Sequence, residues 1–363
     1  MKAPFTAAAA TVLLAACGGV ATGPSNPPVR DLREFEERIE ALRTELGIPA
    51  LSAAIASDGR IVWARGFGTT DLARGVAAGP STEYHLASLT KTFASTVVLQ
   101  LVEEGVIGLD DPVSSYGIEL PSNGVVRVRH LLSHTSEGVP GTTFRYNGAR
   151  FGLLDAVILK ATGQSFAAQL ERRIIRPLGL TRTAPNPADP ASFSVSAADP
   201  GAFAANLARP YALDAQGRAV PSAYPTHFGT AAGLVASVTD VARYAIALDE
   251  GRFLRPETHA LATTPMRAPS GEPLPYALGW FVTSHGGAKV VWHYGYWTAN
   301  SSLIIRIPER RLTFVIAANT DQLSARYDLG SGDLNSSPLA RTFLEGFVSG
   351  SAPLPASAVP ADW

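Results

Sequence analysis

Predicted β-strands lie near both ends of this 363-residue chain, and this arrangement constrains its fold more than any other feature. Two apolar-rich runs, at 51–57 and 60–68, flank Asp58-Gly59, which is a strong signal for a two-residue hairpin turn. Runs with strand character then return only late in the chain, at 278–282, 289–293, 301–307 and 312–318. We therefore expect one antiparallel sheet that is assembled from both ends of the chain.

Helical patterns flank these predicted strands and fill the long segment between them. Residues 30–46 place apolar side chains at helical spacing, and residues 338–348 are predicted to close the chain as another helix. From about 110 to 225, short helical pieces are broken by Pro and Gly. We expect an α/β (α+β) domain over residues 30–348, with terminal helices flanking the sheet and a helical domain inserted at about 110–225. Residues 349–363 would form a C-terminal tail.

Composition and charge argue against one class of partner. Hydrophobic residues make up 46% of the chain, which is enough for a sizeable core. The formal net charge of −1 gives no basic field of the kind that nucleic acid or an anionic membrane surface attracts. We therefore expect a globular protein with no nucleic-acid partner.

The first 17 residues have the features of an export signal. Lys2 supplies a positive charge, residues 3–16 form an apolar run that is too short for a bilayer, and Cys17 follows directly. Leu14-Ala15-Ala16-Cys17 resembles the bacterial lipobox, whose Cys is lipidated and becomes the mature N-terminus. We expect a signal peptide over 1–17, a flexible tether over 18–29 and a periplasmic lipoprotein that is anchored to a membrane through Cys17. An ordinary secretory peptide with an incidental Cys is the alternative.

Ser88-Leu89-Thr90-Lys91 places a hydroxyl and an amine three residues apart at the start of a predicted helix. The chain contains four Lys and 26 Arg, so a Lys kept in its core suggests a need for an amine that can give up its proton. Residues three apart share a helix face, which would let the amine of Lys91 activate the hydroxyl of Ser88 as a nucleophile. An exposed Lys that follows a Ser by chance is the alternative, and the surrounding sequence must decide.

Six stretches of the chain carry a family resemblance in a shared order. They are EYHLASLTKTFASTVVLQLVEEGVIGLDDPV, VRVRHLLSHTSEG, FRYNGARFGLLDAVILKATGQSF, GLVASVTDVARYAIAL, LGWF and VVWHYG. Together they resemble the serine β-lactamase-related hydrolases, the family of class C β-lactamases, D,D-peptidases and similar esterases. The resemblance implies a β-lactamase/transpeptidase-like fold, an acyl-enzyme on Ser88, and Lys91 as base or proton relay.

The resemblance also implies a role for Tyr146 and a difference in the substrate pocket. Tyr146 matches a family tyrosine that helps to move the proton, and its phenol would need the cation of Lys91 nearby to lower its pKa. A packed aromatic with a locally satisfied hydroxyl is the alternative. Gly148 stands where the family has an Asn that contacts the substrate amide, and the side chain of the adjacent Asn147 would point elsewhere. This difference favours esters over lactams and peptides.

His293-Tyr294-Gly295 occupies the third motif of the family, on the strand that faces the serine. The resemblance implies that Gly295 lets the backbone approach the substrate and that the N–H groups of Tyr296 and Ser88 form an oxyanion hole. His293 in place of a Lys removes a fixed positive charge that would bind a substrate carboxylate, which again favours neutral esters. A sheet histidine bonded to a neighbour is the alternative for His293.

We therefore expect a serine hydrolase that acts through an acyl-enzyme on Ser88, and a carboxylesterase on small esters before a β-lactamase or a D-amino-acid peptidase. A non-catalytic binding protein on the same scaffold is the alternative from another class. We expect no metal or organic cofactor. His130 and His134 have the spacing of two zinc ligands on a helix, but no third ligand is evident.

Overall fold

The computed structural model describes residues 28–355 of the chain. The predicted signal peptide and Cys17 lie outside the described residues. Within residues 28–355, no helix is long and apolar enough to cross a membrane.

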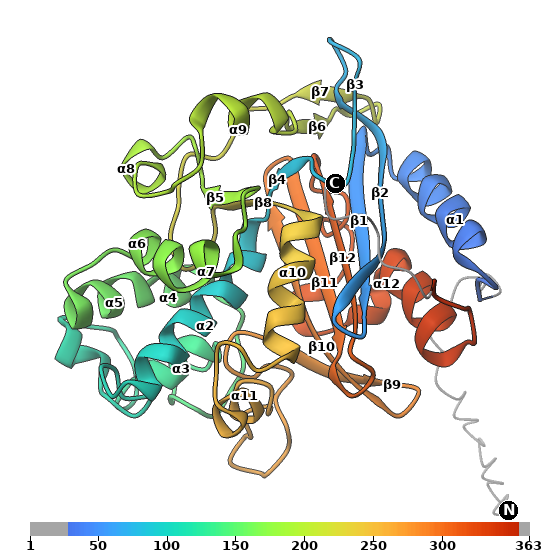
Figure 1. Cartoon of the computed structure of the whole chain (residues 1–363). Coiled ribbons are helices and arrows are strands. Elements are labelled where there is room, and N and C mark those ends of the chain that lie inside the picture. The colour runs from blue at the N-terminus through green and yellow to red at the C-terminus, as the bar shows by residue number, and fades with distance from the viewer. Residues whose placement is uncertain (1–27, 356–363) are drawn as a thin grey trace, which may run out of the picture.

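One seven-stranded antiparallel sheet forms the centre of the fold (Figure 1). Its strands are β1 (Ala50–Ser57), β2 (Arg60–Asp71), β3 (Val76–Ala77), β9 (Phe281–His285), β10 (Ala288–Trp297), β11 (Asn300–Ile307) and β12 (Leu312–Ala318). They are ordered β3-β2-β1-β12-β11-β10-β9, so β1 from the start of the chain pairs with β12 from its end. The predicted antiparallel sheet from both ends of the sequence is confirmed.

The turn between β1 and β2 fixes the register of this hairpin. Asp58 and Gly59 have φ angles of 51° and 80°, and two successive positive φ angles are what a type I′ turn requires. Ser57 therefore pairs with Arg60 across the turn. The register then shifts once, between Ile55 and Ala56, so that Ile55 pairs with Trp63.

Alternate residues of β1 pack into two separate apolar cores. Leu51 and Ile55 face one core, which contains α1 (Leu32–Glu45), α12 (Pro338–Phe343) and the following π-helical turn η7 (Leu344–Ser349). Ala54 and Ala56 face the other core, which contains α2 (Thr90–Glu103) and α10 (Val238–Asp249). Figure 1 shows α1 and α12 on one side of the sheet and α10 on the other. The sheet is thus covered on both faces.

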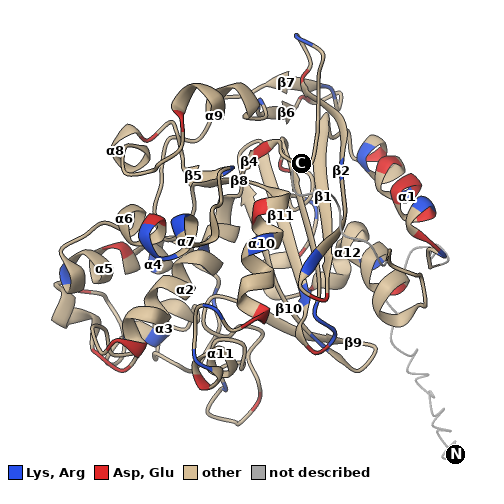
Figure 2. Cartoon of the chain, in the orientation of Figure 1, with Lys and Arg blue, Asp and Glu red and all other residues tan. Residues whose placement is uncertain are grey.

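Charged residues of both signs are mixed on the surface, as Figure 2 shows clearly on α1. There Arg33 pairs with Glu37 at 2.5 Å, and Arg43 pairs with Glu40 at 2.7 Å. Each pair joins residues about one helical turn apart. This mixture agrees with the small net charge of the sequence.

The segment between α2 and α10 forms a region of short helices that lies beside the sheet (Figure 1). Its helical elements are η2 (Val113–Tyr116), α3 (Val128–Leu132), α4 (Gly148–Gly152), α5 (Leu154–Thr162), α6 (Phe166–Leu170), the π-helical turn η3 (Glu171–Ile175), α7 (Arg176–Leu178), α8 (Pro190–Phe193) and α9 (Pro200–Asn206). Three strands of only three residues each also occur there: β5 (Thr183–Pro185), β6 (Tyr211–Leu213) and β7 (Ala219–Pro221). The sequence did not reveal these strands, because three residues are too few to show a two-residue periodicity.

A second, three-stranded sheet holds the segment that contains Ser88. It contains β4 (Glu83–His85) and β8 (Leu234–Ser237), and Ser88 lies in the turn η1 (Ala87–Leu89). The remaining helical elements, outside this sheet, are α11 (Pro256–Ala262), η4 (Pro308–Arg310), η5 (Leu329–Ser331) and η6 (Leu334–Ser336). The order of the second sheet is β4-β8-β5, and η1 directly follows β4. Leu86 N donates to Leu234 O at 2.8 Å, and Leu86 O accepts from Ser302 Oγ of β11 at 2.7 Å. Residue 86 is therefore fixed between the two sheets.

Candidate active site

Ser88 lies in the turn η1, immediately before α2, and is partly exposed between buried neighbours. The preceding residue, Ala87, has a φ of 48°, a left-handed conformation that is unfavourable for a residue with a Cβ. Ala87 N donates to His85 Nδ1 at 3.1 Å, and Ala87 O accepts from Thr90 Oγ1 at 2.7 Å. These two hydrogen bonds hold the strained turn that positions Ser88.

Lys91 lies one helical turn after Ser88 and is completely buried. Its Nζ is 2.9 Å from Ser88 Oγ, and it donates to Ala231 O at 2.8 Å. Burial lowers the pKa of Lys91 to about 7, because the charged ammonium loses its hydration. A large fraction of the amine is thus neutral near pH 7, with a lone pair that can accept the proton of Ser88. Nothing in the sequence had singled out Ala231.

Tyr146 lies beside Lys91, but its pKa is not lowered as expected. Lys91 Nζ is 5.2 Å from the centre of the Tyr146 ring, which is a cation–π distance. The Tyr146 hydroxyl is buried without a hydrogen-bond partner, and burial raises its pKa well above the ordinary value, although the nearby Ser88 hydroxyl opposes this. The expectation of a lowered phenol pKa was wrong, since the loss of hydration on burial raises it. Tyr146 therefore keeps its proton at neutral pH and can serve only as a neutral donor or acceptor.

The ring of His134 packs against the ring of Tyr146. The two ring centres are 4.3 Å apart, and His134 Nδ1 accepts a hydrogen bond from Asn147 N at 3.1 Å. Burial, with a smaller effect of Lys91, lowers the pKa of His134 well below its ordinary value, so the ring is neutral with its proton on Nε2. His130, the other member of the spaced pair, accepts from Arg127 N instead. His130 therefore completes a local turn, whereas His134 joins the segment after α3 to the segment that contains Tyr146.

Gly148 leaves space beside Lys91. A Cβ at this position would lie 3.8 Å from Lys91 Nζ and would meet no other atom within 4 Å. The neighbouring Asn147 cannot fill this space, because its side chain accepts from Arg150 N and donates to Glu137 Oε1. As expected from the sequence, no carboxamide of residues 147–148 faces the amine.

His293 is buried on β10, and both of its ring nitrogens are bonded within the protein. Nδ1 donates to Tyr294 O at 2.7 Å, and this leaves Nε2 to accept from the Tyr276 hydroxyl at 2.8 Å. Burial lowers the pKa of His293 to about 3, so the ring is neutral. The ring therefore offers neither a charge nor a free nitrogen to a substrate and fits the alternative of a bonded sheet histidine. Tyr276 belongs to none of the motifs found in the sequence.

Gly295 packs directly against the segment that precedes Ser88. A Cβ there would collide with Leu86 O and with Ser302 Oγ. The next residue, Tyr296, is 51% exposed, and the Trp297 ring after it lies 5.9 Å from the ring of His85. The close approach of Gly295 to Leu86 brings the backbone of β10 beside η1, where the oxyanion hole of Tyr296 and Ser88 is predicted.

The residues around Ser88 supply parts for acyl transfer to a hydroxyl. They provide Ser88 as a positioned nucleophile and the amine of Lys91, which is partly neutral at pH 7. The backbone of strand β10 lies beside η1 and could supply N–H donors to a substrate carbonyl. Among residues 28–355, no three His, Cys, Asp or Glu side chains are grouped so that they could hold a metal ion.

Comparison with known proteins gives a family match over most of the chain. The sequence model of the Beta-lactamase family matches residues 35–331. Penicillin-binding protein 4* of Bacillus subtilis (strain 168) is 25% identical over 304 residues, which cover 74% of this chain and 67% of that protein. Protein flp of Staphylococcus aureus (strain NCTC 8325 / PS 47) is 27% identical over 174 residues, which cover 38% of this chain and 35% of flp. The aligned segments thus cover about two thirds of penicillin-binding protein 4* and about a third of flp.

Solved structures with the same fold extend this comparison. The octameric penicillin-binding protein homologue from Pyrococcus abyssi superposes with a TM-score of 0.72 at 26% identity, covering 80% of this chain and 74% of that one. The D-stereospecific amidohydrolase from Streptomyces sp. gives a TM-score of 0.68 at 23% identity, covering 87% of this chain and 98% of the other. The second likeness is one of fold alone.

Proposed function

This chain belongs to the Beta-lactamase family of serine hydrolases, and on that premise we propose that it is a carboxylesterase that acts on small neutral esters through an acyl-enzyme on Ser88. The observation that carries the proposal is the pairing of Ser88 with a buried amine whose pKa is about 7. An amine in this state can take the serine proton near pH 7, as a nucleophilic mechanism requires.

In the acylation step, the neutral amine of Lys91 accepts the proton of Ser88 as Oγ attacks the ester carbonyl carbon. The negative charge that develops on the carbonyl oxygen is stabilised by the backbone N–H groups of Ser88 and Tyr296. When the C–O bond of the ester breaks, the proton passes from Lys91 to the leaving alkoxide, directly or through the neutral hydroxyl of Tyr146. The products are an alcohol and an acyl group bonded to Ser88.

In the deacylation step, water takes the place of the alcohol. Lys91, again neutral, accepts a proton from the water molecule as its oxygen attacks the acyl carbon. The proton then returns to Ser88 Oγ as the acyl bond breaks, and a carboxylic acid leaves. One amine serves both steps because each begins with the removal of a proton and ends with its return.

The substrate side of the site supports an ester over a lactam or a peptide. Gly148 offers no amide to bind a substrate carboxamide, and the neutral, fully bonded ring of His293 offers no charge to a substrate carboxylate. The exposed ring of Tyr296 instead provides apolar surface at the rim. A β-lactamase or a D-amino-acid peptidase is the second candidate, and the similarity to penicillin-binding proteins at 25% and 26% identity favours it.

Substrate profiling tests the proposal. The purified protein and its Ser88→Ala variant are incubated with p-nitrophenyl acetate and butyrate, a chromogenic cephalosporin and D-alanyl peptides. We expect esters to be hydrolysed with the highest kcat/KM and the variant to be inactive on all substrates. Faster turnover of the cephalosporin or the peptides would support the second candidate. No turnover, together with no adduct from a fluorophosphonate in intact-mass measurement, would refute the hydrolase mechanism on Ser88.

We also propose that the protein is exported and held at a membrane by a lipid on Cys17. The apolar run before Leu14-Ala15-Ala16-Cys17 supports this proposal. The wild type is expected in the membrane fraction and Cys17→Ser in the periplasmic fraction. Membrane retention of the variant would contradict the lipid anchor.

A further inference from the structure

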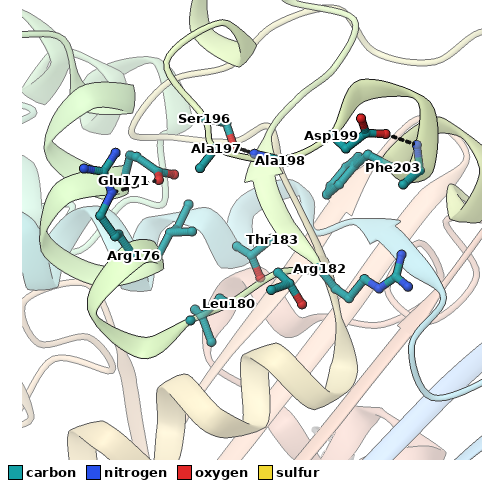
Figure 3. Close-up of a pocket in the computed structure, with 14 residues that line it drawn as sticks. Glu171, Arg176, Leu180, Arg182, Thr183, Ser196, Ala197, Ala198, Asp199 and Phe203 are labelled. Atoms are coloured by element: carbon teal, nitrogen blue, oxygen red, sulfur yellow. Dashed lines mark hydrogen bonds and ion pairs between the residues drawn. The ribbon is translucent and has the colours of Figure 1, made fainter. Parts of the chain in front are cut away.

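A cavity of about 460 Å³ lies in the region of short helices and contains none of the residues around Ser88. Its walls come from the segment around η3 and α7 on one side and from residues 196–203 on the other (Figure 3). This volume lies in the range of sites for small organic molecules. Most of its lining is apolar and includes Ile175, Leu180, Ala198 and Phe203.

Glu171 is the unusual residue of this cavity. It is 3% exposed, and neither of its carboxylate oxygens has a hydrogen-bond partner. A buried carboxylate without donors is unfavourable, because nothing replaces the water it has lost. Glu171 also begins the π-helical turn η3, and such turns are rare and frequent at functional sites. The cavity therefore contains one acidic group that lacks a donor.

Three other polar side chains around the cavity already have partners. Thr183 Oγ1 donates to Asp240, and Arg182 Nη1 donates to Glu83 Oε1. Asp199 accepts from Ala202 N, as the dashed line in Figure 3 shows. Thr183 and Arg182 thus donate to carboxylates outside the cavity and not to Glu171.

Arg176 is the only charged group that the structure places close to Glu171 among the described lining residues, and the contact is loose. Arg176 Nε lies 3.7 Å from Glu171 Oε1, which is beyond hydrogen-bonding distance, and the Arg176 side chain is 70% exposed (Figure 3). Because the distance is long and the Arg176 side chain is mostly in solvent, this ion pair contributes little free energy. A cation that enters the cavity can displace Arg176 from the carboxylate.

We propose that this cavity is a second binding site, for a small primary ammonium compound with an apolar body, such as an arylalkylamine. The ammonium group donates hydrogen bonds to Glu171, and the apolar body packs against Phe203, Ile175 and Leu180. Charge-assisted hydrogen bonds to a buried carboxylate are among the stronger ones in proteins, so the ammonium group confers the specificity.

Titration calorimetry with phenethylamine at pH 7 tests the site, with 2-phenylethanol and phenylacetate as neutral and anionic analogues. We expect phenethylamine to bind at least tenfold more tightly than either analogue. We expect Glu171→Gln to weaken phenethylamine binding at least tenfold, and Arg176→Ala to strengthen it by roughly two- to fivefold, since the competing cation is removed. Glu257→Gln, an exposed change on α11, is the control and should leave binding unchanged.

Two further measurements decide the location of binding. Ala197→Leu extends a side chain from the exposed rim into the cavity and should weaken binding without affecting folding, so the test does not depend on the stability of Glu171→Gln. Protein whose Ser88 carries a fluorophosphonate adduct should still bind phenethylamine. Equal affinity for phenethylamine and 2-phenylethanol, unchanged binding in both Glu171→Gln and Ala197→Leu, or loss of binding on labelling of Ser88 would each overturn the proposal.

Discussion

Replacing Lys91 with Met should abolish hydrolysis and at the same time stabilise the folded protein. The amine is fully buried, and its pKa falls from 10.5 to about 7 through burial alone. Folding above pH 7 therefore requires Lys91 to give up a proton that it holds in the unfolded chain. Met has a similar length and volume and needs no such step.

The expected size of this stabilisation follows from the two pKa values. Each pH unit between them corresponds to 1.36 kcal/mol, so the burial of Lys91 costs about 5 kcal/mol at pH 7. Met also leaves Ala231 O without its donor, and a buried acceptor without a partner costs about 1–3 kcal/mol. The free energy of unfolding of Lys91→Met at pH 7 should thus exceed that of the wild type by about 2–4 kcal/mol.

The pH dependence gives this prediction its sharpest test. Between about pH 7 and pH 10.5, the unfolded wild type holds a proton on Lys91 that the folded protein lacks. The stability of the wild type therefore rises with pH over this window, by up to about 1.4 kcal/mol per pH unit, relative to a variant without the amine. Below about pH 7 both states are protonated, and the difference between the two proteins should stay constant.

Urea unfolding of both proteins at pH 6, 7, 8 and 9 measures this difference, with Lys160→Met on the exposed side of α5 as the matched control. The advantage of Lys91→Met should shrink from pH 7 to pH 9, whereas the control should show no such trend. A difference that does not change between pH 7 and pH 9 would refute a pKa of about 7 for Lys91. If Lys91→Met were less stable than the wild type at every pH, the hydrogen bonds of Lys91 to Ser88 and Ala231 would stabilise the fold by more than the burial of the amine costs.

Three predictions concern activity. The kcat/KM for p-nitrophenyl acetate should rise with pH through an apparent pKa of about 7, since Lys91 must lose its proton before Ser88 can react, and a flat profile from pH 6 to pH 9 would contradict this. Gly148→Asn places a carboxamide beside Lys91 Nζ and should raise the ratio of cephalosporin to ester turnover about tenfold, one factor of ten being 1.36 kcal/mol of transition-state free energy; an unchanged ratio would remove Gly148 from the argument on specificity. Gly295→Ala should lower kcat/KM at least 100-fold, the loss on removing one oxyanion-hole donor, because its Cβ pushes β10 away from Leu86; wild-type activity would show that β10 does not form the oxyanion hole.

The sequence predicted those parts of the site that depend on short spacings. Ser88 and Lys91 share one turn of helix, and the turn at Asp58-Gly59 indicated the hairpin that begins the sheet, so local rules were sufficient. The family resemblance supplied Gly295 and Tyr146. Each of these residues was found through a motif that spans only a few positions of the sequence.

The electrostatic state of the site could not be predicted in the same way, because it depends on residues far apart in the chain. Lys91 is buried and bonded to Ala231, 140 positions later. Nε2 of His293 is bonded to the hydroxyl of Tyr276, which belongs to no motif and lies 17 positions earlier. The pKa of Tyr146 was predicted with the wrong sign, because the sequence showed the nearby cation but not the extent of burial.

The order of pKa values decides which group near Ser88 can exchange a proton under neutral conditions. His293, with a pKa of about 3, stays neutral, and Tyr146 stays protonated, so neither changes charge near pH 7. Asp155 also titrates near this range, with burial raising its pKa to about 6, and it accepts hydrogen bonds from Thr230 N, next to the carbonyl that binds Lys91. If protonation of Asp155 caused the fall of kcat/KM at low pH, this fall would disappear in Asp155→Asn. If protonation of Lys91 causes it, the fall persists in that variant. Because Lys91 Nζ is hydrogen-bonded to Ser88 Oγ, we expect it to persist.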